Sequence, residues 1–274
     1  MSKLDVYAVI GNPIAHSKSP LIHTAFALQT AQSMRYEALL SPVDEFRESV
    51  TAFQQKGGKG LNITVPFKLE AYKCATHLTE RAEMAQAVNT FKFEDSKILG
   101  DNTDGAGLVR DIEINLGVSI DSKRILLMGA GGAARGVILP ILKKNPSILA
   151  IANRTPQKAQ QLQQQFVAYG DIVSGGFMEF SGENFDIIIN ATSASLHDAL
   201  PELPASIFAK DSLAYDMMYG HEPTRFLVFA KQNGAGYLAD GMGMLVEQAA
   251  ESFFLWRGIR PETADVIAQL KIGT

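Results

Sequence analysis

Two charged side chains, Lys68 and Asp104, have the types that acid–base chemistry at a carbonyl carbon requires. Lys68 ends the stretch NITVPFK, and Asp104 lies in GDNTDGAG. Burial favours the neutral amine of a lysine, whereas a neighbouring carboxylate favours the ammonium. If the carboxylate prevails, Lys68 can donate a proton to the alkoxide that forms as a ketone is reduced, and accept one in the reverse reaction. Taken alone, Asp104 is most simply a residue that starts a helix.

The stretch NITVPFK alternates polar and apolar residues, which is typical of a β-strand with one wet face. We expect Ile63 and Val65 to face a core, and Asn62 and Thr64 to face the opposite way. Pro66 ends the strand, because proline cannot donate a hydrogen bond to a neighbouring strand. The turn then carries the lysine back over the polar face, which suits a hydroxylated, anionic small molecule. The alternative is an edge strand whose outer face only contacts water.

A second candidate site follows a strand-like apolar run, in RILLMGAGGAARG. Gly129, Gly131 and Ala134 have the G-x-G-x-x-A spacing that lets a chain turn tightly and approach a pyrophosphate at a helix N-terminus. The order of strand, loop and helix favours dinucleotide binding over the alternative, a purely structural tight turn. Pro140 predicts that the following helix is kinked or short.

The next strand ends at ANRTPQK, which bears on the choice of dinucleotide. NAD sites usually place a carboxylate there, about 20 residues further on, to bind the ribose 2′-hydroxyl. Arg154 takes that place, and a guanidinium pairs with a 2′-phosphate, so the sequence favours NADP over NAD. Asn153, Thr155 and Lys158 add polar and cationic partners. Alternatively, Thr155 caps the helix that Pro156 starts.

These residues are positioned by strands that alternate with amphipathic helices, which predicts an α/β fold with mostly parallel sheets. The expected strands of the first half are 5–11, 35–40 and 60–66, followed by a hairpin of 87–95 and 96–102, and the expected helices are 19–29, 43–55 and 104–117. The second half has continuous apolar strands, as is typical of strands covered by helices on both faces. Two last helices, near 243–256 and 261–270, are expected to pack back on the first half.

Length and composition are those of a globular protein with two domains. The chain has 274 residues, more than a single core usually supports, of which 46% are apolar and 20% are charged. The net charge of −4 argues against a nucleic-acid or anionic-membrane partner. No signal peptide or membrane anchor is visible, which predicts a cytoplasmic protein. Cys74, the single cysteine, is expected to be a packing residue.

A series of stretches comes in the order and spacing of the shikimate dehydrogenases, and the chain resembles this family over essentially its whole length. They are GNPIAHSKSPLIH, NITVPFK, AVNT, DNTDG, GAGGAARG, NRT, NATSAS, YDMMYG and DGMGMLVEQAAESF. The resemblance implies an N-terminal α/β substrate domain and a Rossmann-type dinucleotide-binding domain, with a cleft between them. It places the substrate domain at 1–102, joined by the C-terminal helices of 243–274, and the NADP-binding domain at 103–242.

The resemblance also implies a reaction. The family reduces 3-dehydroshikimate to shikimate with NADPH, in the shikimate pathway that leads to chorismate and the aromatic amino acids. The corresponding expectations are a small-molecule substrate, NADP as cofactor, no metal, no nucleic-acid or membrane partner, and a monomer or homodimer. Two alternatives stay open: a quinate/shikimate dehydrogenase that uses NAD, and a non-catalytic NADP-sensing module on the same fold.

Site residues follow from the matching motifs. For the substrate, the resemblance implies Ser17 and Ser19 at the carboxylate, Thr64, Asn89 and Asp104 at the ring hydroxyls with Asn62 nearby, Lys68 as the catalytic acid and base paired with Asp104, and Tyr219 and Gln248 as further contacts. For the cofactor, it implies Gly129, Ala130, Gly131, Gly132 and Ala133 at the pyrophosphate, Asn153, Arg154, Thr155 and Lys158 at the 2′-phosphate, and Thr192, Met217 and Gly241 along the nicotinamide half. Glu80 is expected to approach the cofactor.

Some of these residues also have a purely structural interpretation. Ser19 precedes a proline and is a candidate helix cap, while Thr192 is a candidate strand end. His16 and His23 flank the serines, but no second partner is visible that would make either one a base, so we interpret both as structural.

Three positions depart from the pattern expected of the family: Thr24, Ala106 and His197. None of them removes a catalytic group. They leave the preference between shikimate and the related quinate open.

Overall fold

The computed structural model describes residues 4–95, 97–192, 194 and 199–272, which form two compact units. The first unit runs to Gly107 and takes in Val246–Gln269. The second unit consists of Leu108–Leu245 with a short final piece from Leu270. From the sequence, the boundaries were expected at 102/103 and 242/243. What each unit binds stays a prediction, and so does the cleft.

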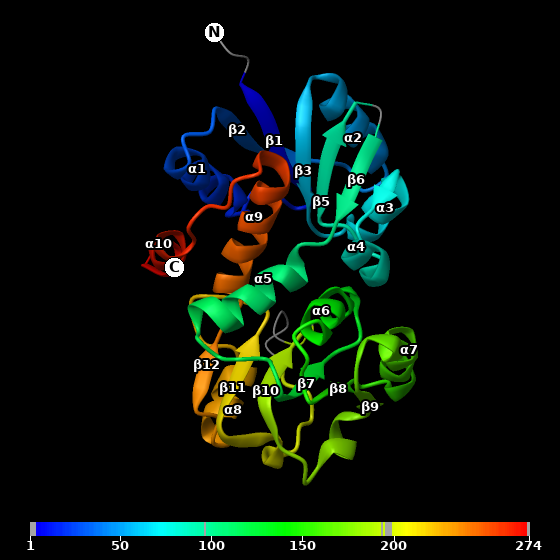
Figure 1. The fold of residues 1–274 in the computed structure, drawn as a ribbon, viewed down its shortest axis with the longest axis vertical. Coiled ribbons are helices and arrows are strands. Elements are labelled where there is room, and N and C mark those ends of the chain that lie inside the picture. The colour runs from blue at the N-terminus through cyan, green and yellow to red at the C-terminus, as the bar shows by residue number, and fades with distance from the viewer. Residues whose placement is uncertain (1–3, 96, 193, 195–198, 273–274) are drawn as a thin grey trace. The chain divides into compact units, whose positions relative to one another are not determined.

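The first unit is built on a six-stranded sheet with the strand order β2-β1-β3-β5-β6-β4 (Figure 1). Its strands are β1 (Asp5–Gly11), β2 (Met34–Leu40), β3 (Gly58–Ile63), β4 (His77–Leu78), β5 (Thr90–Glu94) and β6 (Lys97–Asp101). β1 pairs in parallel with β2 and β3, whereas β5 runs antiparallel to both β3 and β6. The pairing of β5 with β6 confirms the hairpin expected from the sequence.

Helices cover both faces of this sheet. They are α1 (Ser19–Gln29), α2 (Phe46–Gln55), α3 (Lys68–Cys74), α4 (Glu80–Ala85), and most of α9 (Met242–Arg257) and α10 (Ala264–Ile272). Side chains of β1 alternate between the two faces: Ala8 and Ile10 share a core with Phe46 of α2, whereas Tyr7 packs with Trp256 of α9. Figure 1 shows α9 lying across its face of the sheet. The expectation that the penultimate helix packs on the first half is confirmed.

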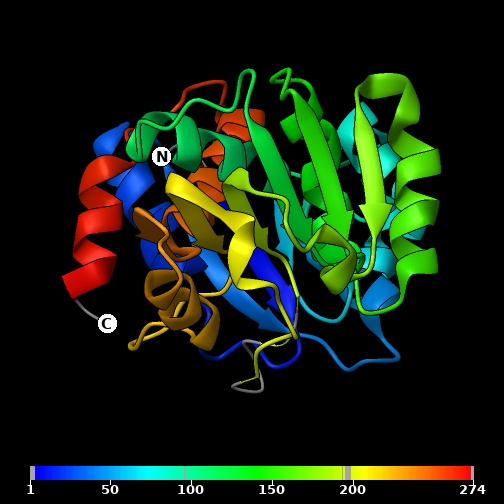
Figure 2. The same ribbon diagram turned by 90° about the horizontal axis from the view of Figure 1, so that it is seen from below.

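The second unit is built on an all-parallel sheet with the order β12-β11-β10-β7-β8-β9 (Figure 2). Its strands are β7 (Arg124–Met128), β8 (Ile148–Ala152), β9 (Ile172–Gly175), β10 (Phe185–Asn190), β11 (Phe208–Asp216) and β12 (Tyr237–Ala239), and its helices are α6 (Gly132–Leu142), α7 (Pro156–Phe166) and α8 (Arg225–Gln232). The chain starts in the middle of the sheet, runs outward to β9, and returns to continue from β10 to β12. This is the order of a doubly wound dinucleotide-binding fold, and it reverses direction between β7 and β10.

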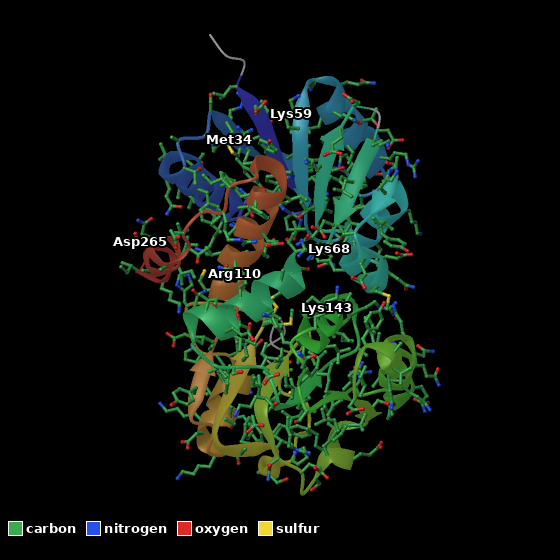
Figure 3. The ribbon with its side chains drawn as sticks, in the orientation of Figure 1. Met34, Lys59, Lys68, Arg110, Lys143 and Asp265 are labelled. Carbon is green, nitrogen blue, oxygen red and sulfur yellow. The ribbon has the colours of Figure 1, made fainter. Side chains whose placement is uncertain are left out.

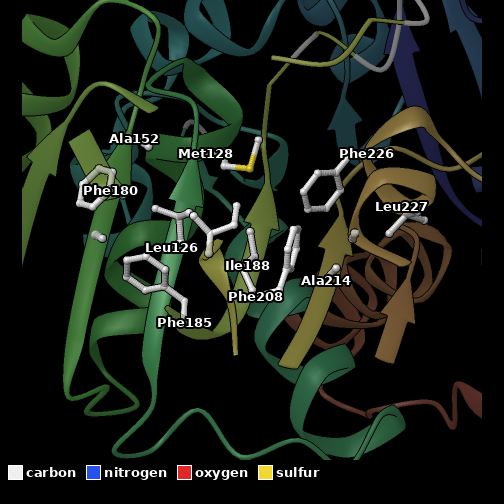
Figure 4. Packing of buried hydrophobic residues seen from close by; sticks show 13 residues of the cluster. Leu126, Met128, Ala152, Phe180, Phe185, Ile188, Phe208, Ala214, Phe226 and Leu227 are labelled. Atoms are coloured by element: carbon white, nitrogen blue, oxygen red, sulfur yellow. The ribbon is translucent and has the colours of Figure 1, made fainter. Parts of the chain in front are cut away.

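The central strands of the second sheet are buried on both faces, as their continuous apolar sequences predict. On one face, Leu126, Ile188 and Ala214 come from three neighbouring strands and share a core with Phe226 of α8 (Figure 4). The apolar runs RILLM, SILAIA and FDIIIN contain the strands β7, β8 and β10, and SLAYD forms the end of β11, whereas β9 and β12 were not expected from the sequence. Short 3₁₀ segments at Val167–Tyr169, Phe177–Phe180 and Ala205–Ile207 complete it.

Two local expectations differ from the structure. Val65, expected in the core, is 66% exposed, because β3 ends at Ile63 and the chain is already in the turn. The helix expected over 104–117 is α-helical only in α5 (Asp104–Arg110) and continues as a π-helix over Asp111–Asn115. Pro140 lies inside α6, which ends two residues later at Leu142; whether it kinks the helix stays a prediction.

No helix in the described part of the chain is long and apolar enough to cross a membrane.

Candidate active site

The polar residues expected at the substrate gather at one edge of the first unit's sheet. Ser17 and Thr64 follow the carboxyl ends of β1 and β3, and Asp104 follows β6. Asn89 directly precedes β5, whose antiparallel direction places its amino end at the same edge. Strand direction alone therefore brings together residues that are far apart in the sequence.

Lys68 and Asp104 form an ion pair with a distance of 2.6 Å between Nζ and Oδ2. Each of them is the first residue of a helix, α3 and α5 respectively. Their side chains are 33% and 14% exposed, so a small molecule can reach both. Figure 3 marks the position of Lys68 in the first unit. The carbonyl oxygen of Lys68 accepts a hydrogen bond from the Val88 N–H at 2.9 Å, which ties the start of α3 to the segment before β5. The structure thus brings together the pair that the sequence suggested.

Asn89 links this ion pair to its surroundings. Its Nδ2 donates to Asp104 Oδ1 at 2.8 Å and to Gln248 Oε1 at 3.3 Å, and its Oδ1 accepts from the Thr103 backbone N–H at 2.9 Å. Asp104 therefore holds Lys68 with one carboxylate oxygen and Asn89 with the other. Gln248, on α9, joins the same group of side chains.

Asn62 lies behind these residues and has little contact with solvent. It is 6% exposed, its Oδ1 accepts from the Tyr36 hydroxyl at 2.7 Å, and its Nδ2 donates to Thr90 Oγ1 at 3.1 Å. Thr64 is half-buried beyond the end of β3, and its backbone N–H donates to Ile10 O at 3.0 Å. Of the polar face predicted for this strand, Thr64 remains accessible, and Asn62 is satisfied by protein partners.

Ser17 and Ser19 lie together at the start of α1. The Ser19 backbone N–H donates to Ser17 Oγ at 3.3 Å, and Ser19 is the first helical residue, with Lys18 in the capping position. The alternative that Ser19 caps the helix is therefore wrong. His23 is fully buried, as a structural residue is, and neither of its ring nitrogens has a hydrogen-bond partner among the residues that the structure describes. Burial lowers the pKa of His23 to about 3, and the nearby Asn62 side chain opposes this only in part.

The residues expected along the nicotinamide half gather at the carboxyl edge of the second unit's sheet. Gly129, Thr192, Met217 and Gly241 follow β7, β10, β11 and β12, respectively. In parallel sheets, ligands bind at this edge, next to the point where the strand order reverses. Here that point lies between β7 and β10, where Gly129 and Thr192 are found.

Close backbone approach explains the glycines at this edge. A Cβ atom on Gly241 would lie 2.2 Å from the carbonyl oxygen of Met217. Gly129 has a φ of +108°, which side chains rarely adopt, and a Cβ there would lie 3.1 Å from Ala191 O. Met217 in turn donates its N–H to Asn190 O at 3.0 Å, which fixes it to the end of β10.

The loop after β7 opens onto the N-terminus of α6. Gly131, Gly132 and Ala133 are exposed, and the space around the two glycines is open to 4 Å where a Cβ would be. Ala134, the last residue of the glycine pattern, is fully buried, which lets the helix pack close to the sheet. Ala130 is half-buried. The first N–H groups of a helix have no intrahelical partner, so this exposed end suits an anion.

Arg154 and Lys158 lie beyond the end of β8 with exposed side chains. Within the described ranges of the chain, neither has a carboxylate partner. Asn153 donates from Nδ2 to Thr155 O at 2.9 Å. Thr155 occupies the capping position of α7, but its side chain makes no capping hydrogen bond. The Thr155 hydroxyl therefore does not cap α7. The exposed side chains of Arg154 and Lys158 are available to an anionic ligand.

The structure does not bring every expected residue into these groups. Glu80 is the first residue of α4 in the first unit, and Tyr219 follows β11 in the second, 36% exposed. Their roles at the cofactor and the substrate stay predictions. His197 lies outside the described residues.

A partly buried ion network beside the site was not anticipated from the sequence. Arg81 donates to Asp101 through Nε at 2.7 Å and to Glu251 Oε1 at 2.9 Å, and Arg260 also pairs with Glu251. Burial by itself lowers the pKa of Arg81, but the hydrogen bonds and charges of Asp101 and Glu251 outweigh burial and raise it. Asp101 stands in the quoted motif DNTDG, yet spacing alone does not reveal which cation reaches it. The network joins α4, the end of β6 and α9.

Comparisons with known proteins match successive parts of the chain to the same family. Residues 9–91 match the family model of the shikimate dehydrogenase substrate binding domain, residues 112–200 that of shikimate / quinate 5-dehydrogenase, and residues 241–271 that of the shikimate 5′-dehydrogenase C-terminal domain. A curated shikimate dehydrogenase (NADP(+)) from Nitrosospira multiformis is 64% identical over 97% of each chain.

Solved structures are similar over the same length. The crystal structure of an Ael1 enzyme from Pseudomonas putida has a TM-score of 0.93 and 50% identity, covering 97% of this chain and 98% of that one. The shikimate 5-dehydrogenase of Thermus thermophilus, in complex with NADP(H) and shikimate, has a TM-score of 0.87 and 30% identity, covering 99% of this chain and 100% of that one.

Proposed function

The chain belongs to the shikimate dehydrogenase family, and from this premise we propose that it catalyses the reversible, NADPH-dependent reduction of 3-dehydroshikimate to shikimate. The observation that carries the proposal is the ion pair of Lys68 and Asp104, 2.6 Å long and partly exposed at the polar edge of the first sheet. A non-catalytic sensor would have no need of an ammonium and a carboxylate held in this arrangement.

Lys68 is the proton donor and acceptor in this proposal. In the direction of reduction, its ammonium gives a proton to the oxygen of the ketone as that oxygen becomes an alkoxide. In the direction of oxidation, the neutral amine takes the hydroxyl proton back. Asp104 holds the ammonium in place through Oδ2, while Asn89 holds the other carboxylate oxygen, so that the pair keeps one orientation. The nicotinamide cofactor supplies the hydride when it is bound.

The substrate is a hydroxylated carboxylic acid, and the polar edge offers a partner for each of its groups. We assign its carboxylate to Ser17 and Ser19 at the start of α1. We assign its ring hydroxyls to Thr64, Asn89 and Asp104, with Gln248 as a further contact that Asn89 already orients. The same proposal gives a substrate contact to Tyr219.

The residues of the second unit fit NADP. The exposed N-terminus of α6, flanked by Gly131 and Gly132, has room and unpaired N–H groups for a pyrophosphate. Arg154 and Lys158 would hold the 2′-phosphate, with Asn153 and Thr155 beside them. The glycines and their neighbours at the carboxyl edge would line the nicotinamide half, and Glu80 would approach it from α4. A cytoplasmic location and a monomer or homodimer complete the proposal.

The test is the absorbance of reduced nicotinamide after shikimate is added to purified protein with NADP⁺ or NAD⁺, and after quinate is added in the same way. We expect turnover with shikimate and NADP⁺, with a kcat/KM well above that of the other three combinations. No turnover with any combination would contradict the proposal. A preference for quinate and NAD⁺ would replace it with the related quinate/shikimate activity.

A further inference from the structure

A directed chain of hydrogen bonds leads from the interior of the first unit to the ion pair. The Tyr36 hydroxyl donates to Asn62 Oδ1 at 2.7 Å, and Asn62 Nδ2 donates to Thr90 Oγ1 at 3.1 Å. The Thr90 hydroxyl donates to Asn89 Oδ1 at 2.9 Å, and Asn89 Nδ2 donates to Asp104 Oδ1 at 2.8 Å. We call these residues the relay. It runs from β2 through β3 and β5 to the start of α5.

Each member of the relay fixes the orientation of the next one. A hydroxyl has one hydrogen, so Thr90 cannot donate to both of its neighbours. Because it donates to Asn89, its oxygen must accept from Asn62. An amide side chain can be turned over at little steric cost, and its neighbours decide which end is oxygen. The phenol of Tyr36 decides this for Asn62, and the Thr90 hydroxyl, together with the Thr103 N–H, decides it for Asn89.

The interior end of the relay is buried, and its phenol keeps its proton. The Tyr36 ring is 8% exposed and stacks on His23, with ring centroids 4.1 Å apart and an interplanar angle of 7°. The ring of Trp256 also contacts His23, with 5.3 Å between the ring centroids. Burial raises the pKa of Tyr36 well above its ordinary value, so the phenol keeps its proton and remains a donor at neutral pH. Thr90 is fully buried.

We propose that Thr90 and Tyr36 are positioning residues for the acid–base pair: through Asn62 and Asn89 they hold the carboxylate of Asp104 in the orientation that keeps Lys68 in place. Neither residue touches the substrate in this proposal. The inference rests on the proposed function for its kinetic consequence, but the hydrogen-bond chain itself can be tested without turnover.

Thr90→Val is the direct test, because valine keeps the shape of threonine and removes only the hydroxyl. We expect kcat for shikimate oxidation to fall about 10- to 100-fold, the range expected when a reacting group is slightly misplaced, with KM for NADP⁺ unchanged. The solvent deuterium isotope effect on kcat should grow, because proton transfer becomes slower. Loss of folded protein alone would lower the rate but would not move this isotope effect.

Two further variants guard against a simple folding defect. Thr90→Ser keeps the hydroxyl and should restore kcat and the isotope effect close to the wild-type values. Tyr36→Phe removes the first donor of the relay and should lower kcat by a smaller factor. The double variant should lose no more than Thr90→Val alone, whereas independent effects would multiply.

Tyr7→Phe is the matched control. Tyr7 lies on the neighbouring strand β1, is 3% exposed and packs on the same face of the sheet, but its hydroxyl accepts from Arg257 and takes no part in the relay. We expect wild-type kcat and isotope effect in this variant. A similar loss in Tyr7→Phe and Tyr36→Phe, or wild-type kinetics in Thr90→Val, would overturn the proposal.

Hydrogen exchange of the Asn89 side-chain amide, followed by NMR, tests the relay whether or not the protein turns over shikimate. The amide signals are assigned by their loss in Asn89→Asp. We expect faster exchange in Thr90→Val and Tyr36→Phe, and wild-type exchange in Tyr7→Phe. Unchanged exchange in the two relay variants overturns the inference, while an inactive wild-type protein overturns only the proposed function.

Discussion

Lys68 and Asp104 form an ion pair that solvent can reach, and this accessibility bears on whether the pair serves stability or chemistry. Ion pairs in contact with solvent stabilise proteins by about 0–1 kcal/mol. The 2.6 Å pair, with a third of the lysine side chain exposed, therefore contributes little to folding. The pair is instead suited to chemistry, because it can hold a proton next to a reacting oxygen.

Arg154 tests the choice of cofactor at the scale of one residue. Its exposed guanidinium lies beyond β8 in the place where NAD sites have a carboxylate. Arg154→Ala should raise KM for NADP⁺ by about 10-fold or more, since a charge-assisted pair with a phosphate contributes about 1.5–3 kcal/mol, and should leave KM for NAD⁺ nearly unchanged.

Steady-state kinetics with both cofactors measure this change. Arg124→Ala is the control. Arg124 starts β7 in the second unit, and its side chain is also accessible to solvent, but it pairs with Glu183. An equal effect of Arg154→Ala on both cofactors would contradict the assignment of the 2′-phosphate to Arg154.

The positions of Lys68 and Asp104 could be predicted from the sequence better than the contacts of the residues around them. The turn after Pro66 delivers Lys68 as expected, because a short strand and a proline leave the chain few ways to continue. Asn62 was harder to predict, since its burial depends on Tyr36, which lies on another strand. Thr90 stands in the quoted motif AVNT, but only the three-dimensional structure shows which of its neighbours it holds.

At the scale of elements, Gly241 is the point where the segment before α9 meets the end of β11. A Cβ at this position would lie 2.2 Å from the backbone oxygen of Met217, and a backbone atom cannot move aside as a flexible side chain can. Gly241→Ala should therefore displace this segment, weaken NADP binding by at least about 10-fold and lower the melting temperature.

Fluorescence titration with NADPH and a thermal melt measure both effects. Gly220→Ala is the matched control, because the nearest atom to a Cβ there is the Glu222 carbonyl oxygen, 3.8 Å away. If Gly241→Ala binds NADPH as the wild type does, the close approach at this edge does not shape the cofactor site.

Elements were predictable where their own sequence determines them. β1, α1 and the β5–β6 hairpin lie where alternation and turn residues placed them. The π-helix over Asp111–Asn115 was not predictable, because it depends on tertiary contacts: the buried Asp111 carboxylate accepts from the Tyr215 hydroxyl at 2.6 Å. Val65 was misplaced because the strand stops at Ile63, before the alternation of polar and apolar residues ends.

At the scale of the molecule, buried His23 makes the stability of the first unit depend on pH. Its pKa is about 3 in the folded protein and 6.5 ordinarily, so between these values the unfolded chain binds a proton that the folded chain does not. The free energy of unfolding therefore falls with decreasing pH, by about 1.4 kcal/mol per pH unit below 6.5. The lowered pKa of Glu251 adds a loss of the same sign at more acidic pH, because its paired carboxylate must be protonated.

His23→Phe should remove the first of these losses, since phenylalanine suits a site lined by Phe26, Tyr36 and Trp256. Relative to the wild type, the variant should gain about 2 kcal/mol of unfolding free energy between pH 7 and pH 5. Urea unfolding followed by the fluorescence of Trp256, the single tryptophan, measures this directly in the first unit. His16→Gln, at an exposed histidine, should leave the pH dependence as it is, and a His23→Phe curve parallel to the wild type would refute the explanation.

The central claim is that the Lys68 ammonium moves the proton of the reaction, and the most direct test is kcat for shikimate oxidation by Lys68→Ala. We expect kcat to fall about 10²- to 10⁴-fold, with little change in the KM values or the melting temperature. Lys59→Ala, at the far end of β3 from the site, should retain wild-type kcat. Wild-type turnover by folded Lys68→Ala would contradict the account.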